Sequence, residues 1–170
     1  QVSAQSIGDP CTLRTDNGDY SLVSMAECVG MPMAPADSPG AARACAHSVE
    51  NPDNSRVYFA GGYCSYYAQR CTSNGGLGSL ICGAVAAIGD IDTFRSCPAP
   101  FILSRTVETA SFGTLGSADI EITFCLKPCT TDSDCRVRQF DDVFDEFARY
   151  TCTTGTIDGV SRRYCIDDRL

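Results

Sequence analysis

The run Cys129-Thr130-Thr131-Asp132-Ser133-Asp134-Cys135 lies in the stretch that decides the fold of this chain. That stretch, Cys125 to Cys165, holds five of the twelve cysteines found in 170 residues. No two cysteines stand in the Cys-x-x-Cys spacing that structural zinc sites favour, and His47 is the only histidine. The sequence therefore predicts a disulfide framework, with no metal or cofactor site.

A hairpin is expected near the end of this stretch, because Asp158-Gly159 is a preferred two-residue turn. A turn centred there places Ile157 opposite Val160 and Cys152 opposite Cys165. By alternation along the strands, the two cysteines form a non-hydrogen-bonded pair, whose close Cα atoms suit a cross-strand disulfide. We therefore predict a disulfide between Cys152 and Cys165.

The spacer from Arg136 to Thr151 has the pattern of an amphipathic helix. Four apolar residues recur at spacings of three, four and three and share one helix face: Val137, Phe140, Phe144 and Phe147. Charged side chains occupy the remaining face. Two interpretations stay open: the helix packs on the chain's own core, or it docks in a groove of another subunit or partner. In the second case these four residues are the partner-binding residues.

Outside this stretch the local signals predict short elements of both kinds. The expected elements, in chain order, are a hairpin turning at Asn17-Gly18, a helix from Pro39 to Val49 capped by Ser38, a strand from Arg56 to Ala60 ended by Gly61-Gly62, a helix from Ser79 to Ile88, and antiparallel strands over Phe101 to Ala110 and Asp119 to Leu126. Together with the spacer helix they predict an α+β fold. It is disulfide-rich, with short antiparallel hairpins and two or three short helices.

The cysteine count suggests two connected regions. Residues 1–124 form an N-terminal disulfide-rich α+β region, and residues 125–170 form a C-terminal cysteine-rich module with the inserted helix. Seven cysteines precede residue 100 and five lie from Cys125 onward, so both counts are odd. If every cysteine is paired, at least one disulfide must join the two regions.

Charge and motifs argue against two classes of function. A net charge of −8 opposes binding to the phosphates of nucleic acid. No Gly-x-Ser-x-Gly nucleophile elbow is present, and any triad would have to use His47, which has no flanking signature. Several acidic pairs occur, but neighbours in sequence do not show two carboxylates facing each other across a cleft. We therefore expect that the protein is not an enzyme.

Asp132 and Asp134 leave two interpretations open. Their carboxylates could supply the oxygen ligands that calcium prefers. The loop lacks the glycine and the closing glutamate of a twelve-residue calcium loop, however. The simpler interpretation is that Asp132, Ser133 or Asp134 caps the helix that is expected to follow.

The protein is expected to be secreted, extracellular or at the cell surface. High disulfide content fits an oxidising compartment, and no apolar run reaches the ~18–20 residues that span a bilayer. The sequence begins at Gln1 without an apolar leader, either because a signal peptide has been removed or because the sequence is a trimmed piece. Residues 1–9 read as a polar arm that lies across its own domain or is held by a neighbouring subunit.

The pattern Cys-x-x-Asp-x-Asp-Cys, followed by a cysteine in a short hairpin and a terminal cysteine, resembles small secreted cysteine-rich modules. Similar spacing occurs in the four-disulfide core of whey acidic protein and in related extracellular repeats, including those of bacterial surface proteins. The resemblance covers residues 125–165 and implies an inhibitor, an adhesion unit or a structural spacer. The adjacent Cys-Cys pair of the four-disulfide core is missing here, which argues against protease inhibition.

These observations predict an extracellular structural or interaction protein, such as a subunit of a surface assembly or filament. Its expected partners are proteins, and self-association is the first expectation. The alternative is a secreted binding protein or inhibitor that acts on a soluble partner.

Overall fold

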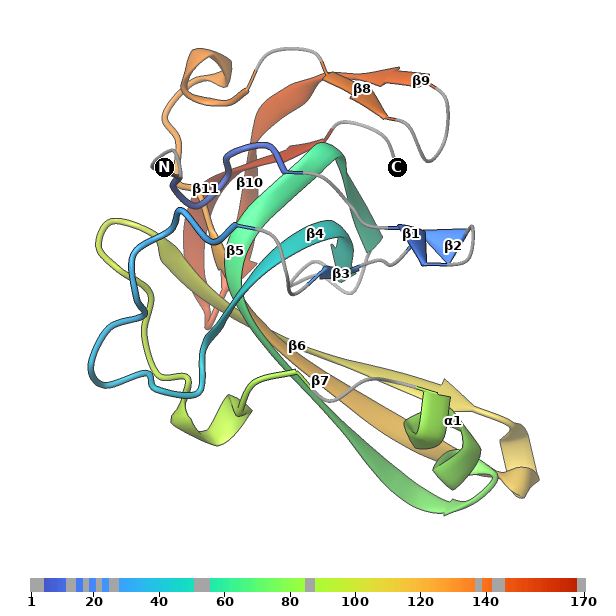
Figure 1. Cartoon of the computed structure of the whole chain (residues 1–170). Helices are drawn as coiled ribbons and strands as arrows, with labels where there is room; N and C mark the ends of the chain where they lie inside the picture. The colour runs from blue at the N-terminus through green and yellow to red at the C-terminus, as the bar shows by residue number, and fades with distance from the viewer. Residues whose placement is uncertain are drawn as a thin grey trace.

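The computed structural model describes residues 5–11, 15–16, 19–20, 23–24, 28–50, 56–84, 88–136, 139–141 and 146–167. Within these residues the chain is mostly antiparallel β-sheet (Figure 1). The largest sheet has the strand order β3-β4-β5-β7-β6. Its strands are β3 (Val23–Ser24), β4 (Ala42–Glu50), β5 (Arg56–Gly76), β7 (Gly116–Leu126) and β6 (Ile102–Ser111).

The described residues also form three smaller sheets of two strands each. They pair β1 (Thr15–Asp16) with β2 (Asp19–Tyr20), β8 (Gln139–Asp141) with β9 (Glu146–Ala148), and β10 (Tyr150–Ile157) with β11 (Val160–Asp167). The helical segments are α1 (Gly78–Ala84) and three 3-10 helices at Ile91–Thr93, Gly113–Leu115 and Asp132–Asp134.

The three strands β5, β7 and β6 form an arm. Figure 1 shows them running together away from the rest of the fold, with α1 beside their far end. The expected antiparallel pairing of the two strands after Cys97 is confirmed, since β6 pairs with β7 from Ile102↔Leu126 to Ser111↔Ser117. The hairpin expected at Asn17-Gly18 is confirmed where it is described, with Thr15 opposite Tyr20.

The expected α+β fold is wrong, and the segment 39–49 shows why. It forms strand β4 and pairs with β5, with Cys45 directly opposite Cys64. Ser38 does not cap a helix; its Oγ accepts hydrogen bonds from the backbone N–H groups of Arg95 and Ser96. Local helix propensity contributes less free energy than the pairing and burial of a strand inside a sheet. The tertiary pairing therefore decides the conformation of this segment.

The amphipathic helix expected from Arg136 to Thr151 is also wrong. Strands β8 and β9 occupy part of this segment and place Phe140 directly opposite Phe147. A separation of seven residues places two positions on one face of a helix, but it can also place them opposite each other in two paired antiparallel strands. Val137 and Phe144 lie outside the described residues.

Two further element predictions were partly right. The helix expected over Ser79 to Ile88 is present as the shorter α1, while Ile88 forms an isolated bridge with Gln69. The strand from Arg56 is present, but Gly61-Gly62 does not end it. Both glycines have positive φ, and the register with β4 shifts there, so they bend one continuous strand at a bulge.

All twelve cysteines are paired, and the predicted Cys152–Cys165 bond is wrong. The disulfides are Cys11–Cys45, Cys28–Cys64, Cys71–Cys82, Cys97–Cys125, Cys129–Cys152 and Cys135–Cys165. The hairpin itself forms as expected, with Ile157 opposite Val160. The bond that the odd counts require between the two regions is Cys97–Cys125.

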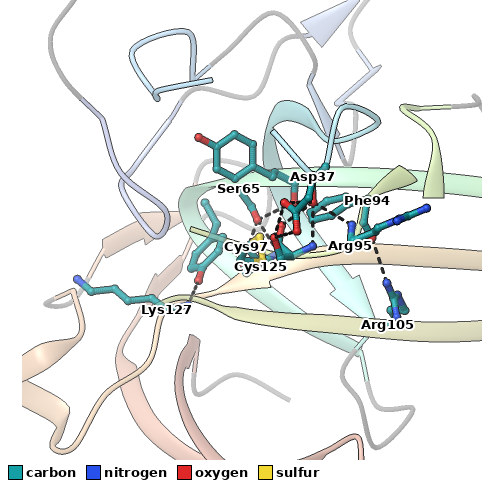
Figure 2. The surroundings of a disulfide bond; sticks show 12 residues. Asp37, Ser65, Phe94, Arg95, Cys97, Arg105, Cys125 and Lys127 are labelled. Carbon is teal, nitrogen blue, oxygen red and sulfur yellow. Dashed lines mark hydrogen bonds between the residues drawn. A yellow bond between two sulfur atoms is a disulfide. The ribbon is translucent and has the colours of Figure 1, made fainter. Parts of the chain in front are cut away.

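The surroundings of Cys97–Cys125 hold the base of the arm (Figure 2). Ser65 Oγ accepts the backbone N–H of Cys125 at 2.9 Å and is fully buried with it. On the other side of the bond, Arg105 donates to the backbone oxygen of Phe94 at 3.0 Å. The segment before Cys97 is therefore fixed to the sheet by both covalent and polar contacts.

The same disulfide arrangement occurs twice. In each case two cysteines lie opposite each other on paired strands but are not bonded to each other. Each bonds to a cysteine of an earlier segment: Cys45 to Cys11 and Cys64 to Cys28 in the first case, and Cys152 to Cys129 and Cys165 to Cys135 in the second. The backbone agrees as well: Cys64 N–H donates to Asp9 O at 2.9 Å, and Cys165 N–H donates to Lys127 O at 3.0 Å. Both accepting residues precede a Pro-Cys-Thr sequence, and both donating cysteines follow a tyrosine.

We call each hairpin, together with the earlier segment bonded to it, a unit. The N-terminal segment belongs to the first of these two units. Ile7 is buried, and Gly8 N–H donates to Cys64 O at 2.9 Å. Gln5 exchanges hydrogen bonds with the backbone of Gly30. Two interpretations were open for the N-terminal residues 1–9. Residues 5–9 follow the first of them, because they lie across their own domain.

The two units contact each other around Arg136. Its guanidinium donates to the Gly62 carbonyl of β5 and, at 2.8 Å, to the Tyr150 hydroxyl of β10. It also lies 4.4 Å from the centre of the Tyr150 ring, where a cation–π attraction adds to the contact. Burial lowers the Arg136 pKa from its usual value. This side chain joins the C-terminal hairpin to the long strand of the main sheet.

Candidate interaction surface

The far end of the arm gathers four leucine and phenylalanine residues from two turns. Consecutive backbone hydrogen bonds connect them: Leu80 N–H to Leu77 O at 3.0 Å, Leu77 N–H to Leu115 O at 2.7 Å, and Leu115 N–H to Phe112 O at 3.3 Å. These residues belong to α1 and the turn before it, and to the turn between β6 and β7. We call Leu77, Leu80, Phe112 and Leu115 the tip cluster.

All four side chains of the tip cluster are exposed. Their exposed fractions are 38% for Leu77, 65% for Leu80, 48% for Phe112 and 59% for Leu115. Single exposed apolar residues are normal on any surface, but several gathered at one end of the fold indicate an interaction site. The tip cluster is therefore a candidate contact surface.

The frame beneath the tip cluster is tightly fixed. The Cys71–Cys82 disulfide ties α1 to β5. A Cβ atom at Gly78 would collide with the Ser117 carbonyl, so helix and sheet approach as closely as glycine allows. A surface held in one conformation loses less entropy when it binds.

The arm end is also free of charge. No charged residue occurs from Cys71 to Gly89 or from Thr109 to Ala118, although 20% of the whole chain is charged. Charged residues flank both runs in the sequence, at Arg70, Asp90, Glu108 and Asp119. Arg70 is bound to Glu121 at 2.7 Å and to Asp92 at 2.9 Å, whereas Asp119 accepts a hydrogen bond from Thr109 at 2.7 Å, which lowers the Asp119 pKa.

A second apolar surface is concave and lies in the body of the fold. It is a groove of about 300 Å³ lined by Val29, Met33, Ala34, Ala41, Ala42 and Arg43. Val29 is 51% and Met33 79% exposed. Arg43 shapes the groove, because one of its nitrogens donates to the backbone oxygens of Val29 and Met31 at 3.1 and 3.0 Å. We call this surface the body groove.

Of the four residues that the sequence suggested for partner binding, the structure places two, and both lie in strands away from the two surfaces. Phe140 and Phe147 lie in β8 and β9, which Figure 1 shows far from α1. Val137 and Phe144 are outside the described residues, so partner binding by these four residues stays a prediction. The tip cluster had a signal that helix periodicity does not capture, namely leucine and phenylalanine beside glycine in long uncharged runs.

The carboxylates of Asp132 and Asp134 serve the chain itself. Asp134 accepts hydrogen bonds from the backbone N–H and hydroxyl of Thr130, both at 2.8 Å, and from Thr131 N–H at 3.0 Å. These bonds lower the Asp134 pKa to about 2. Asp132 accepts the backbone N–H of Cys152 at 2.8 Å. The helix that these residues were expected to cap is not present among the described residues, and Asp134 instead closes the 3-10 turn to which it belongs. Calcium binding by these carboxylates stays a prediction.

Two groups of cysteines have sulfur atoms close enough together to suggest metal ligands. Sγ atoms of Cys129, Cys135 and Cys165 lie within 4.8 Å of one another, as do those of a second group in the N-terminal unit. All of these sulfurs are used in disulfides. His47, the residue that any triad would need, lies in strand β4.

Comparison with protein-family models, with curated proteins and with solved structures finds no match. The six disulfides are consistent with a cysteine-rich module, and no match supports a specific family resemblance. Disulfide content of this kind is typical of extracellular or secreted proteins. Among the described residues, no helix is long and apolar enough to cross a membrane.

Proposed function

We propose that this is an extracellular structural protein, a subunit of a surface assembly, that acts by binding other protein chains through its tip cluster. The role is binding and not catalysis. The observation that carries the proposal is the projecting arm with four exposed apolar side chains at its end.

Two features of the arm support this function. Its end combines exposed leucine and phenylalanine with the absence of charge, the composition found at the buried centre of protein interfaces. Its disulfide and its close helix–sheet contact fix that surface before binding. Exposed apolar area on a rigid frame is stabilised when a partner removes it from water.

The alternative is a secreted binding protein that acts on a soluble partner. The shape of the arm favours this second function specifically, because a narrow projection can enter the concave site of an unrelated protein (Figure 1). The state of association of the protein on its own separates the two functions.

The test is sedimentation velocity of the native, disulfide-bonded protein over a range of concentrations. We expect the average mass of the wild type to rise with concentration, and Leu80→Asp and Leu115→Asp to suppress that rise. Val160→Asp is the matched control, since Val160 is 51% exposed and belongs to neither surface. A wild type that stays monomeric at the highest concentration contradicts the assembly function and favours a soluble partner.

A further inference from the structure

We propose that the tip cluster of one copy seats in the body groove of a second copy, so that the chains associate head to tail. This inference rests on the proposed function and names the partner of the same surface. The occupant of the groove is the arm end of an identical chain.

Shape is the first argument. The tip cluster is a convex end of a projecting arm, whereas the body groove is a hollow of about 300 Å³. A contact between two tip clusters would bury little area, and two body grooves would not contact each other. One chain carries both complementary shapes, at separate places: α1 marks the far end of the arm, and the groove-lining loop lies in the body (Figure 1).

Chemistry is the second argument. Both surfaces expose large apolar side chains, with Leu80 and Leu115 on the arm and Val29 and Met33 at the groove. Methionine adapts its flexible side chain to the shape of an incoming group, which suits a receiving surface. A contact between the two removes apolar area from water on both sides.

Charge is the third argument and the one that favours a second copy. Copies with a net charge of −8 repel each other, so self-contact is favoured where carboxylates are missing. Among the residues that the structure describes, no carboxylate lines the body groove, and the sequence has none in the uncharged runs of the arm end. Of the described residues that line the groove, the charged one is the cation Arg43, and the first charged residue of β7 below the tip is the anion Asp119.

Symmetry follows from the use of two different surfaces. When each contact joins two different surfaces, every added copy leaves one tip cluster and one body groove free at the ends of the assembly. The assembly then grows into an open chain, or into a ring if the rotation between copies closes.

The test uses one variant for each surface, Leu80→Asp on the tip and Met33→Asp in the groove. Their side chains are 65% and 79% exposed, so both variants should fold with wild-type disulfides and wild-type thermal unfolding. Each variant alone is expected to weaken association by about 10-fold or more. An equimolar mixture of the two should form a dimer and stop there, because one intact tip meets one intact groove.

Each other outcome contradicts the inference in a recognisable way. If Met33→Asp assembles like the wild type, the groove is not the receiving surface, although the proposed function survives. If Met33→Asp stops at a dimer on its own, the tips bind each other. If the wild type never associates, self-assembly fails together with the inference. Leu115→Asp and Val29→Asp repeat the experiment with independent positions.

Discussion

Cys152 and Cys165 are directly opposite each other across the β10–β11 hairpin, yet they are not bonded to each other. The N–H of Cys165 donates outward to Lys127 O, and that of Cys152 donates to Asp132, so the two form the non-hydrogen-bonded pair that the turn predicts. A third segment runs beside β11 and supplies Cys129 and Cys135. The cross-links therefore tie this segment to the hairpin instead of joining the two strands.

The pairing predicts the result of peptide mapping. Digestion under non-reducing conditions should release Cys129 with Cys152 and Cys135 with Cys165. Replacing Cys129 and Cys152 together by serine should lower the free energy of unfolding by roughly 2–4 kcal/mol, since the unfolded chain gains freedom. Denaturant unfolding in the absence of reductant measures this. A peptide that joins Cys152 to Cys165 contradicts the structure.

The Cys71–Cys82 bond should act locally. It closes a loop of only 11 residues of separation, against 36 for Cys28–Cys64, so its removal should cost less global stability. Replacing both cysteines by serine should instead speed amide hydrogen exchange in α1 and weaken association. Exchange in β10 and β11 serves as the internal control. Unchanged exchange in α1 would show that the disulfide does not hold the tip.

Arg136 should be a strong contributor to the contact between the two units. Arg136→Ala removes donors to the Gly62 carbonyl and the Tyr150 hydroxyl, for an expected loss of about 1.5–3 kcal/mol of unfolding free energy. Arg136→Lys should recover only part of it, because one ammonium lacks the planar fork and stacks less well on the Tyr150 ring. Chemical denaturation measures both variants. Equal stability of wild type and Arg136→Ala contradicts the role.

The Asp134 turn should respond to acid. The folded pKa of Asp134, about 2, lies below its usual value of 3.8, so the hydrogen bonds to Thr130 and Thr131 contribute fully above about pH 4. That contribution is lost as the pH falls through about 2. Carboxyl and amide NMR shifts should follow this titration, and Asp134→Asn should abolish it. A midpoint near 4 would contradict the observed bonding.

Met33 should be the preferred target of oxidation among the methionines that the structure describes. It is 79% exposed, whereas Met31 is 3% exposed. Dilute peroxide should convert Met33 to the sulfoxide first, which makes the body groove polar and weakens association. Mass spectrometry locates the oxygen and sedimentation measures the association. Met33→Leu should resist the effect, and peroxide sensitivity that persists in this variant contradicts the role of the groove.

Several features could be predicted from the sequence because they depend on local or counting arguments. Asp158-Gly159 determined its hairpin and register, since few residue pairs accept that turn. Alternation of apolar and polar residues predicted β7 and its pairing with β6. The odd cysteine counts required a bond between the regions, and Cys97–Cys125 is that bond.

Other features were decided only by the tertiary structure. Segment 39–49 has helix signals but pairs with β5. The spacing of Phe140 and Phe147 fits one face of a helix as well as two opposite positions of paired strands, and the structure shows the strands. The disulfide partners of Cys152 and Cys165 depend on a segment that comes alongside from earlier in the chain.

The tip cluster and the body groove likewise need residues far apart in sequence, since Leu77 meets Leu115 only when β5 and β7 pair. The sequence by itself determined turns, alternation and the need for a connecting disulfide, because these follow from steric preferences of a few neighbouring residues. The tertiary structure decided the sheet, the cysteine partners and the contact surfaces, because long-range pairing and burial outweigh local propensity.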